Sequence, residues 1–398
     1  MGGAHAHRAS DLDVEVQRTP RLVLVGSLVL AALVTVIGVV LLWPDGDRVD
    51  ALAEASPFAA PGVTFPRAEV LEVGDPCPPG QPAPDCGQAR VRVTEGADDG
   101  RELSIGLPPE VVASDLAAGD TVRLIRNPPA AEGQESSLGF FGVARTTPVV
   151  VLLALFVLVV LAVARWRGLM ALVGLAFAGV VLSLFVLPSL LSGGSPTWVG
   201  VVGSAAIMFV VLYTTHGWSL RTSAALAGTL AGIGVTAVLG ALAVSSTRLS
   251  GVADEGGQAL LTFAPDLSFT DLFACAIVIA GLGVLNDVTI TQASAVWELR
   301  AASPTMSRAR VFASGMRIGR DHIASTIYTI VFAYAGTALV VLLVLRLYQL
   351  PVLDLLATEE IGQEVVRTLA TSIGLVLAVP LTTLIAVATL PPGQDEHA

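Results

Sequence analysis

The stretch PVVVLLALFVLVVLAVARWRGLMALVGLAFAGVVLSLFVL, residues 148–187, decides the class of fold. Its only charged side chains are Arg165 and Arg167. A helix needs about 20 apolar residues to cross the hydrocarbon core of a bilayer, so the stretch is long enough for two spans separated by the arginines. Backbone groups cannot stay unpaired in hydrocarbon, and each span is therefore expected to be a helix.

Apolar runs of this kind recur along the chain. Of the 398 residues, 54% are hydrophobic and 14% are charged, whereas a soluble domain has about 25% charged residues. We expect a predominantly α fold, a polytopic membrane bundle of about eight transmembrane helices, seven of them within 148–390. The expected spans are 22–43, 148–164, 168–187, 198–213, 222–244, 272–292, 323–345 and 368–390.

The first run, 22–43, has two interpretations. Ala51-Leu52-Ala53 resembles a signal-peptide cleavage site. The apolar run is longer than the roughly 7–15 residues of a signal peptide, however, and the site lies well beyond its end. We therefore expect an uncleaved membrane anchor.

Arginines near the ends of the spans predict the orientation, because cytoplasmic loops carry the excess of basic residues. With a cytoplasmic N-terminus, the outer short loops hold Arg248, Arg346 and Arg367. We therefore expect both tails, 1–21 and 391–398, in the cytoplasm. The inner arginines are Arg8, Arg18, Arg21, Arg165, Arg167, Arg221, Arg300, Arg308, Arg310, Arg317 and Arg320.

The acidic charge is concentrated in one segment, 44–147, which this orientation places outside. The net charge is −11, and this segment holds 17 acids and 8 arginines, which is −9 of the total. All basic residues are arginine, and the chain has no basic patch, so nucleic acid is not an expected partner. The expected partners are the lipid bilayer, a small-molecule or ion substrate, and a protein that binds the outward segment.

Residues 62–127 of this segment are expected to form a small β-domain between the first two spans. Alternating or apolar runs predict short strands, and the Pro- and Gly-rich stretches 44–61 and 127–147 indicate linkers. The predicted strands are 68–73, 90–94, 102–107 and 121–125, with turns at 96–100 and 119–120.

Two cysteines in the β-domain, Cys77 and Cys86, frame a short Pro-rich loop. A disulfide is the expected state outside the cell. A two-cysteine metal site is disfavoured because no histidine lies in the segment to complete four ligands. Cys275 is expected to be a small core residue of a helix.

Asp287 is the one charged side chain inside the eight expected spans. An ionisable group at membrane depth is costly and marks a functional site by default. Asn286 is adjacent, and Thr291 lies one turn along the same helix face. Two structural alternatives stay open: Asp287 is hydrated or paired with an arginine at the inner interface, or it joins helices as a neutral carboxyl group.

The most basic segment, 298–321, follows this helix and is expected to lie as a helix or loop along the inner surface. Its end, Arg317, Arg320 and Asp321, directly precedes the seventh span, where Ser325 and Thr329 share a face with Asp321. An ion pair between Asp287 and one of these arginines is a specific hypothesis.

Motifs of common enzyme chemistry are absent from the sequence. It contains no Walker motif, no HExxH and no G-x-S-x-G. We therefore expect no enzymatic activity, no catalytic residue, no cofactor and no metal.

Two stretches carry a resemblance to a known family. GLGVLNDVTITQASAVWELR (281–300) and GMRIGRDHIASTIYTIVFAYAG (315–336) resemble the signature stretches of the YibE/YibF-like bacterial membrane proteins, over about residues 65–390. The resemblance implies a multi-pass protein of the bacterial plasma membrane. It places an acid at Asp287 and a G-x-x-I-G-R-D run at 315–321, while Tyr328 departs from the asparagine more often seen there. The Asp287 helix is also similar to the fourth helix of SecF and of RND-type permeases, where acids are linked to proton flow.

These observations support two functions above others. The first is a transporter or export-related permease with Asp287 as proton or ion coupling site. The second is a non-transporting scaffold or sensor whose β-domain binds a partner outside. An intramembrane enzyme is a third and weaker hypothesis, because no nucleophile or metal cluster supports it.

Overall fold

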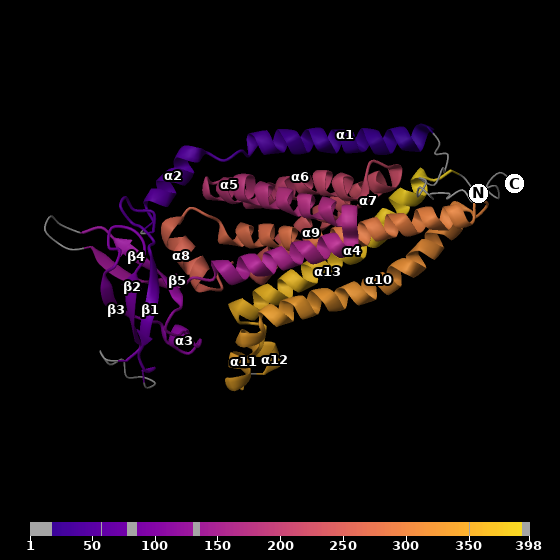
Figure 1. Cartoon of the computed structure of the whole chain (residues 1–398). Coiled ribbons are helices and arrows are strands. Elements are labelled where there is room, and N and C mark those ends of the chain that lie inside the picture. The colour runs from indigo at the N-terminus through magenta and orange to yellow at the C-terminus, as the bar shows by residue number, and fades with distance from the viewer. Residues whose placement is uncertain (1–17, 57, 78–85, 130–135, 350, 392–398) are drawn as a thin grey trace, which may run out of the picture. The chain divides into compact units, whose positions relative to one another are not determined.

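The computed structural model describes residues 18–56, 58–77, 86–129, 136–349 and 351–391. The predicted tails therefore lie almost wholly outside the described residues. The chain divides into two compact units. The sheet unit is Asp50–Val163, and the helical unit is Met1–Val49 together with Ala164–Ala398 (Figure 1).

The sheet unit contains one five-stranded antiparallel sheet. Its strands lie in the order β3-β2-β1-β4-β5. Alternate residues point to one face and form the core, as with Val70 and Val91, which face each other across β1 and β2 and are fully buried. The strands are β1 (Arg67–Val73), β2 (Gln88–Val93), β3 (Glu102–Gly106), β4 (Thr121–Asn127) and β5 (Ser137–Val143).

All four predicted strands are confirmed, and so are the turns, where Gly96, Gly100 and Gly119 have positive φ. The linker interpretation of 127–147 is wrong for its second half. β5 lies there and pairs with β4 along its length, so the sheet extends beyond residue 127. The other expected linker, 44–61, contains the helix α2 (Gly46–Glu54). A short helix, α3 (Pro109–Val112), lies between β3 and β4.

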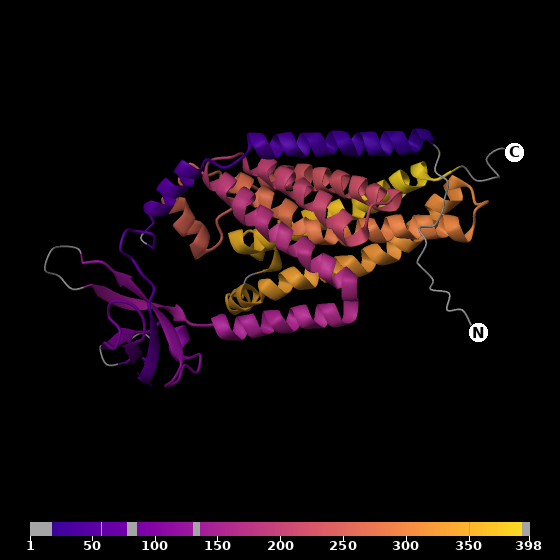
Figure 2. The ribbon, with the colours of Figure 1, turned by 45° about the horizontal axis from the view of Figure 1, so that its top comes forward.

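The helical unit contains the long helices of the chain. Figure 2 shows them from a second direction. They are α1 (Arg18–Leu41), α4 (Thr146–Val181, which begins in the sheet unit), a π-helical turn (Leu182–Val186), α5 (Leu187–Leu191), α6 (Pro196–His216), α7 (Leu220–Thr247), α8 (Glu255–Phe263), α9 (Phe269–Ala302), α10 (Arg308–Thr337), α11 (Leu339–Leu347), α12 (Val352–Leu355) and α13 (Glu359–Thr389).

Among the described residues, six helices are long and apolar enough to cross a membrane, or seven if α10 and α11 count as one broken span. Two expected spans, 148–164 and 168–187, fall in α4 and its extension to Leu191. Arg165 (φ 53°, ψ −129°) breaks that element at the expected boundary. The expected span 323–345 falls on α10 and α11, which meet at an angle of 64°.

The basic segment 298–321 also differs from expectation. Its first residues end α9 and its remainder forms the first half of α10, so it contains no separate surface helix. Ser307 caps the N-terminus of α10 by accepting a hydrogen bond from the Arg310 backbone N–H. This cap, which precedes a charged stretch, starts α10 fifteen residues before the predicted span.

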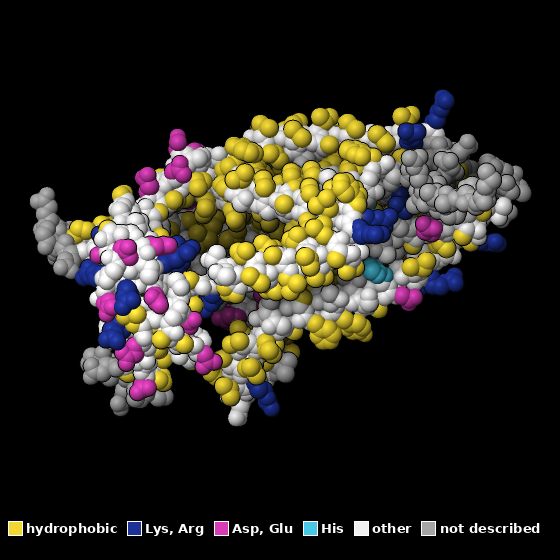
Figure 3. All heavy atoms as spheres, viewed as in Figure 1, with side chains coloured by type: hydrophobic (Ala, Val, Ile, Leu, Met, Phe, Trp, Pro, Cys, Tyr) yellow, Lys and Arg dark blue, Asp and Glu magenta, His cyan; other side chains and the backbone are white. Residues whose placement is uncertain are grey.

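Helices α7, α9 and α13 form the centre of the helical unit. Glycines allow the close approach: a Cβ on Gly232 of α7 would lie 2.9 Å from Leu285 Cδ2 of α9. Small residues serve this purpose in membrane helices, where burial of apolar surface gives little drive for association. On the face that Figure 3 shows, hydrophobic side chains cover much of the helices, acids are most frequent on the sheet unit, and arginines lie on both units.

Candidate functional site

Asp287 lies near the middle of α9, a helix of 34 residues. Residues 272–297 of this helix carry no other charged side chain. They span about 39 Å at the 1.5 Å rise of an α-helix, more than the roughly 30 Å hydrocarbon core. Asp287 is therefore at membrane depth if α9 crosses the bilayer, and it is not a residue of a helix end.

The ionisable neighbour of Asp287 is His322 of α10. The Asp287 Oδ2 to His322 Nε2 distance is 3.7 Å, and the two side chains are 67% and 29% exposed. His322 lies in the middle of α10. Its Nε2 atom is buried, with no hydrogen-bond partner among the described residues. The geometry brings an acid and an imidazole together between two long helices.

The predicted arginine partner of Asp287 is wrong. Arg317, Arg320 and Asp321 are all exposed. Within the described chain, none of the three has an ion pair within 4.0 Å. They precede His322 by one to five residues, so they extend from it toward the start of α10 by about 8 Å at most.

The hydroxyl groups around this pair bond to their own helices. Thr291 Oγ1 donates to the Asp287 backbone oxygen at 2.7 Å, Thr329 donates to the Ser325 backbone oxygen at 3.2 Å, and Ser325 donates to the His322 backbone oxygen at 3.4 Å. Asn286 presents a buried Oδ1 atom without a partner among the described residues. Of the predicted site residues, Asp287 contacts α10 through His322, and Thr291, Ser325 and Thr329 are exposed like Asp287.

Gln292 has a structural role that spacing alone did not reveal. Its side chain is 3% exposed and donates to the Gly315 backbone oxygen (2.9 Å) and to Thr383 Oγ1 (2.7 Å). One amide thereby joins α9, α10 and α13. A Cβ on Gly319 would lie 2.6 Å from Val379 Cγ1, so the glycines of the G-x-x-I-G-R-D run allow α10 to approach α13. The run is therefore explained in part by packing.

A second polar cluster joins the same three helices nearer their other end. Arg367 and Glu364 of α13 form an ion pair of 2.8 Å whose side chains are 23% and 26% exposed. The Arg367 guanidinium lies over the rings of Phe273 (5.3 Å) of α9 and Tyr334 (5.9 Å) of α10. Phe273 is 14 residues, or about 20 Å, from Asp287 along α9. The cluster was not predicted from the sequence, because Arg367 was expected in an outer loop.

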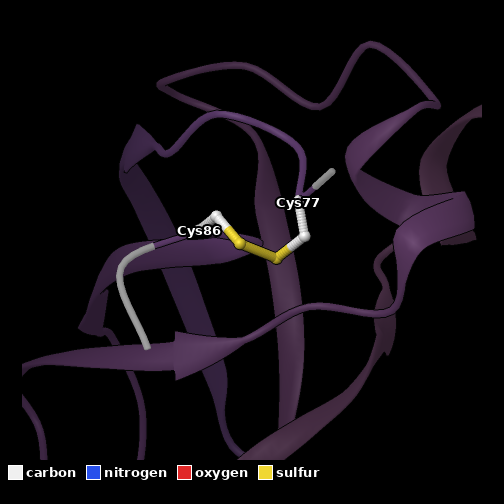
Figure 4. The surroundings of a disulfide bond; sticks show 2 residues. All are labelled: Cys77 and Cys86. Carbon is white, nitrogen blue, oxygen red and sulfur yellow. A yellow bond between two sulfur atoms is a disulfide. The ribbon is translucent and has the colours of Figure 1, made fainter. Parts of the chain in front are cut away.

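The cysteines fall into two groups. Cys77 and Cys86 are joined by a disulfide in the sheet unit (Figure 4). Cys275 is buried in α9, and its Sγ would lie 2.8 Å from a Cβ on Gly200 of α6, so it packs two helices. Among the described residues, no group of three or more His, Cys, Asp or Glu side chains could hold a metal ion.

Long apolar helices joined by buried polar contacts define the chain as a multi-pass helical membrane protein. The YibE/F-like protein family model matches residues 152–392, and the chain belongs to this family. The match includes both signature stretches and the Asp287–His322 pair, and it begins after the sheet. No curated protein and no solved structure matches the chain.

Proposed function

We propose that this protein is a permease in which Asp287 and His322 couple proton movement to the movement of an ion or small molecule. One observation carries the proposal. A carboxylate and an imidazole, 3.7 Å apart, lie half-way along two long adjacent helices, α9 and α10. Ionisable residues at such a position are costly and are retained at ion and proton pathways.

The chemistry of the pair suits proton transfer. An imidazole takes up a proton at neutral pH more readily than other side chains, and a carboxylate accepts or returns one. The buried Nε2 atom of His322 faces Asp287 and has no other partner among the described residues. A proton held between the two groups changes their charge, and with it the attraction between α9 and α10.

Proton flux in proteoliposomes tests this proposal. The purified chain is reconstituted with a pH-sensitive dye inside, and a pH gradient is imposed. We expect Asp287→Asn to lower the flux at least tenfold. The matched control is Asp271→Asn, an exposed acid in the first turn of the same helix, which should leave the flux unchanged. Equal flux in wild type and Asp287→Asn excludes the coupling role.

The same proposal includes a location and an orientation. The excess of arginines in the expected inner loops supports an orientation with both termini in the cytoplasm, and the resemblance to the YibE/YibF-like bacterial membrane proteins supports the bacterial plasma membrane. Reporter fusions after Ala398 and after Gly100 test it. The first should be active only as a cytoplasmic reporter and the second only as an external one, and the reverse pattern contradicts the orientation.

A second candidate function, a scaffold or sensor, is favoured by an aromatic patch on the sheet unit. Phe58 and Phe141 are 55% and 46% exposed. The ring of Phe141 lies 6.1 Å from that of Phe58 and 4.7 Å from that of Phe65, measured between ring centroids. Exposed aromatic clusters of this kind mark protein interfaces. A photo-crosslinking residue at Phe141 should give a discrete adduct in intact cells, absent when it is placed at the exposed Glu110. Equal patterns at the two positions remove support for this function.

A further inference from the structure

One side of the α9–α10 pair is exposed although it is polar. We name it the polar face and define it by Gly283, Asp287, Thr291, Ser325 and Thr329, which are all exposed. The opposite sides of the same helices are buried, at Val288 and Gln292 of α9 and at Gly315, Gly319 and Ile330 of α10. The two halves of the polar face meet at the contact between Asp287 and His322.

Lipid cannot cover this face without a large cost. The hydroxyls of Thr291 and Thr329 already donate to their own helices, so they tolerate an apolar neighbour. The carboxylate of Asp287 has no proton to donate to the backbone of its own helix. It is 67% exposed, and its neighbour His322 approaches from one side. A carboxylate facing hydrocarbon costs several kcal/mol in translocon and simulation scales, so the open side of Asp287 needs a polar cover.

Other exposed surfaces of the helical unit differ from the polar face in composition. The exposed side chains of α7, for example, include Val238 and Leu242, at 59% and 60%. Those of α1 include Leu30 and Val34, at 63% and 59%. Such surfaces suit lipid. The polar face is distinguished from them by its carboxylate.

We propose that a second copy of this chain covers the polar face, so that the Asp287 site is completed by two protomers. This side of α9 and α10 carries both acidic and basic groups: Asp287 and His322 lie on it, and the exposed Asp321 and Arg317, one turn apart on α10, border it. A twofold axis sets a surface against itself, and each acid then finds a basic group of the partner copy. Gly283 allows close approach, since a Cβ there would meet nothing within 4 Å.

Cysteine cross-linking in native membranes tests the interface. Gly283→Cys, Thr291→Cys and Ser325→Cys each place a thiol on the polar face, and the wild type is the background because Cys275 is buried. We expect at least one variant to give, on mild oxidation, a disulfide-linked species of twice the 40.9 kDa chain mass. The matched control is Gly234→Cys on α7, an exposed helical glycine whose Cβ would also meet nothing within 4 Å.

A second pair of variants keeps the proposal testable if oxidation fails. Gly283→Leu fills open space in one protomer and should lower the dimer fraction in nanodiscs at least fivefold, measured by mass photometry. Gly234→Leu should leave it unchanged. A monomeric wild type, a dimer that both leucine variants retain, or cross-links only to a species of another mass overturns the proposal.

The outcome is separable from that of the transport proposal, because the interface is argued from the exposure and the charges of the polar face and not from proton movement. A dimer without proton flux would contradict coupling and keep the interface. Flux by a monomer would keep coupling and contradict the interface.

Discussion

The sheet unit and the helical unit place their charged side chains in opposite ways. In the sheet unit, ion pairs such as Arg92–Glu102 lie on the surface between strands, with both side chains 46% exposed. In the helical unit, Arg367–Glu364 is 23% and 26% exposed and lies among three helices. A pair in water contributes about 0–1 kcal/mol, whereas a charge at membrane depth persists only with a partner or a function. Charge substitutions in the sheet unit therefore test stability, and those in the helical unit test mechanism.

The largest stability effect is expected at the disulfide of the sheet unit. Replacing both Cys77 and Cys86 by serine frees the loop of nine-residue separation in the unfolded chain. The loop-entropy model predicts a loss of about 2–3 kcal/mol. Hydrogen exchange of the full chain measures it: protection should fall in β1 and β2 and stay unchanged in α9. The control is Cys275→Ala, which should spare the sheet, and an unchanged sheet in the double variant contradicts the prediction.

In the helical unit the largest effect should come from packing. Gly319→Val brings a side chain to within 2.6 Å of Val379 Cγ1 and 2.9 Å of Gln292 Oε1. Overpacking of this kind costs about 1–3 kcal/mol. Gly336→Val, on the same helix, meets nothing within 4 Å and is the control. Thermal unfolding in detergent should show a lower Tm for the first variant alone, and equal Tm values refute the close contact.

A smaller effect is expected from the buried amide. Gln292→Leu removes the hydrogen bonds to Gly315 and Thr383 that join three helices. Interhelical hydrogen bonds in membranes contribute about 0.6–1.7 kcal/mol. Its neighbour Thr291 bonds within its own helix, so Thr291→Val is the matched control. Unfolding in mixed micelles should distinguish the two, and equal losses would argue against the role of the amide.

The smallest effect concerns acid stability of the sheet unit. The hydrogen bond from Arg126 holds the pKa of Asp98 below its usual value of 3.8. A group with a lowered pKa stabilises the fold above its unfolded value, and this contribution is lost as pH falls through the folded pKa. Arg126→Gln should therefore lower sheet stability at pH 7 by up to about 1 kcal/mol and reduce the further loss below pH 3.8. Tryptic protection at pH 7 and exchange protection at acidic pH measure this. Wild-type behaviour of the variant at both pH values contradicts it.

The sequence predicted the first four strands of the sheet and missed the last one. Strands β1 to β4 alternate clearly, and glycines with positive φ mark their turns. Strand β5 was missed because glycines at 139 and 142 interrupt its apolar residues and Pro- and Gly-rich stretches flank it. Pairing with β4 stabilises β5. The spacing of apolar residues within one strand does not show which strand it pairs with.

The sequence predicted the residue of the candidate site on α9, Asp287, but not its contact with His322 on α10. Asp287 is identifiable because it is the one charge in a 26-residue stretch of α9, residues 272–297. Its neighbour His322 depends on the register in which α9 and α10 cross, and Gln292, Gly315 and Gly319 set that register through tertiary contacts. The ion pair of Glu364 and Arg367 was missed for a similar reason, because α13 begins before its apolar residues do.

The central claim is that Asp287 and His322 act as one proton-coupling unit, and a double-mutant cycle on proton flux tests it most directly. Flux is measured in proteoliposomes for Asp287→Asn, His322→Gln and the double variant. Residues that act as a unit are non-additive, so we expect the double variant to lose no more flux than Asp287→Asn alone. Independent, multiplicative losses, or a His322→Gln variant with wild-type flux, would contradict the account.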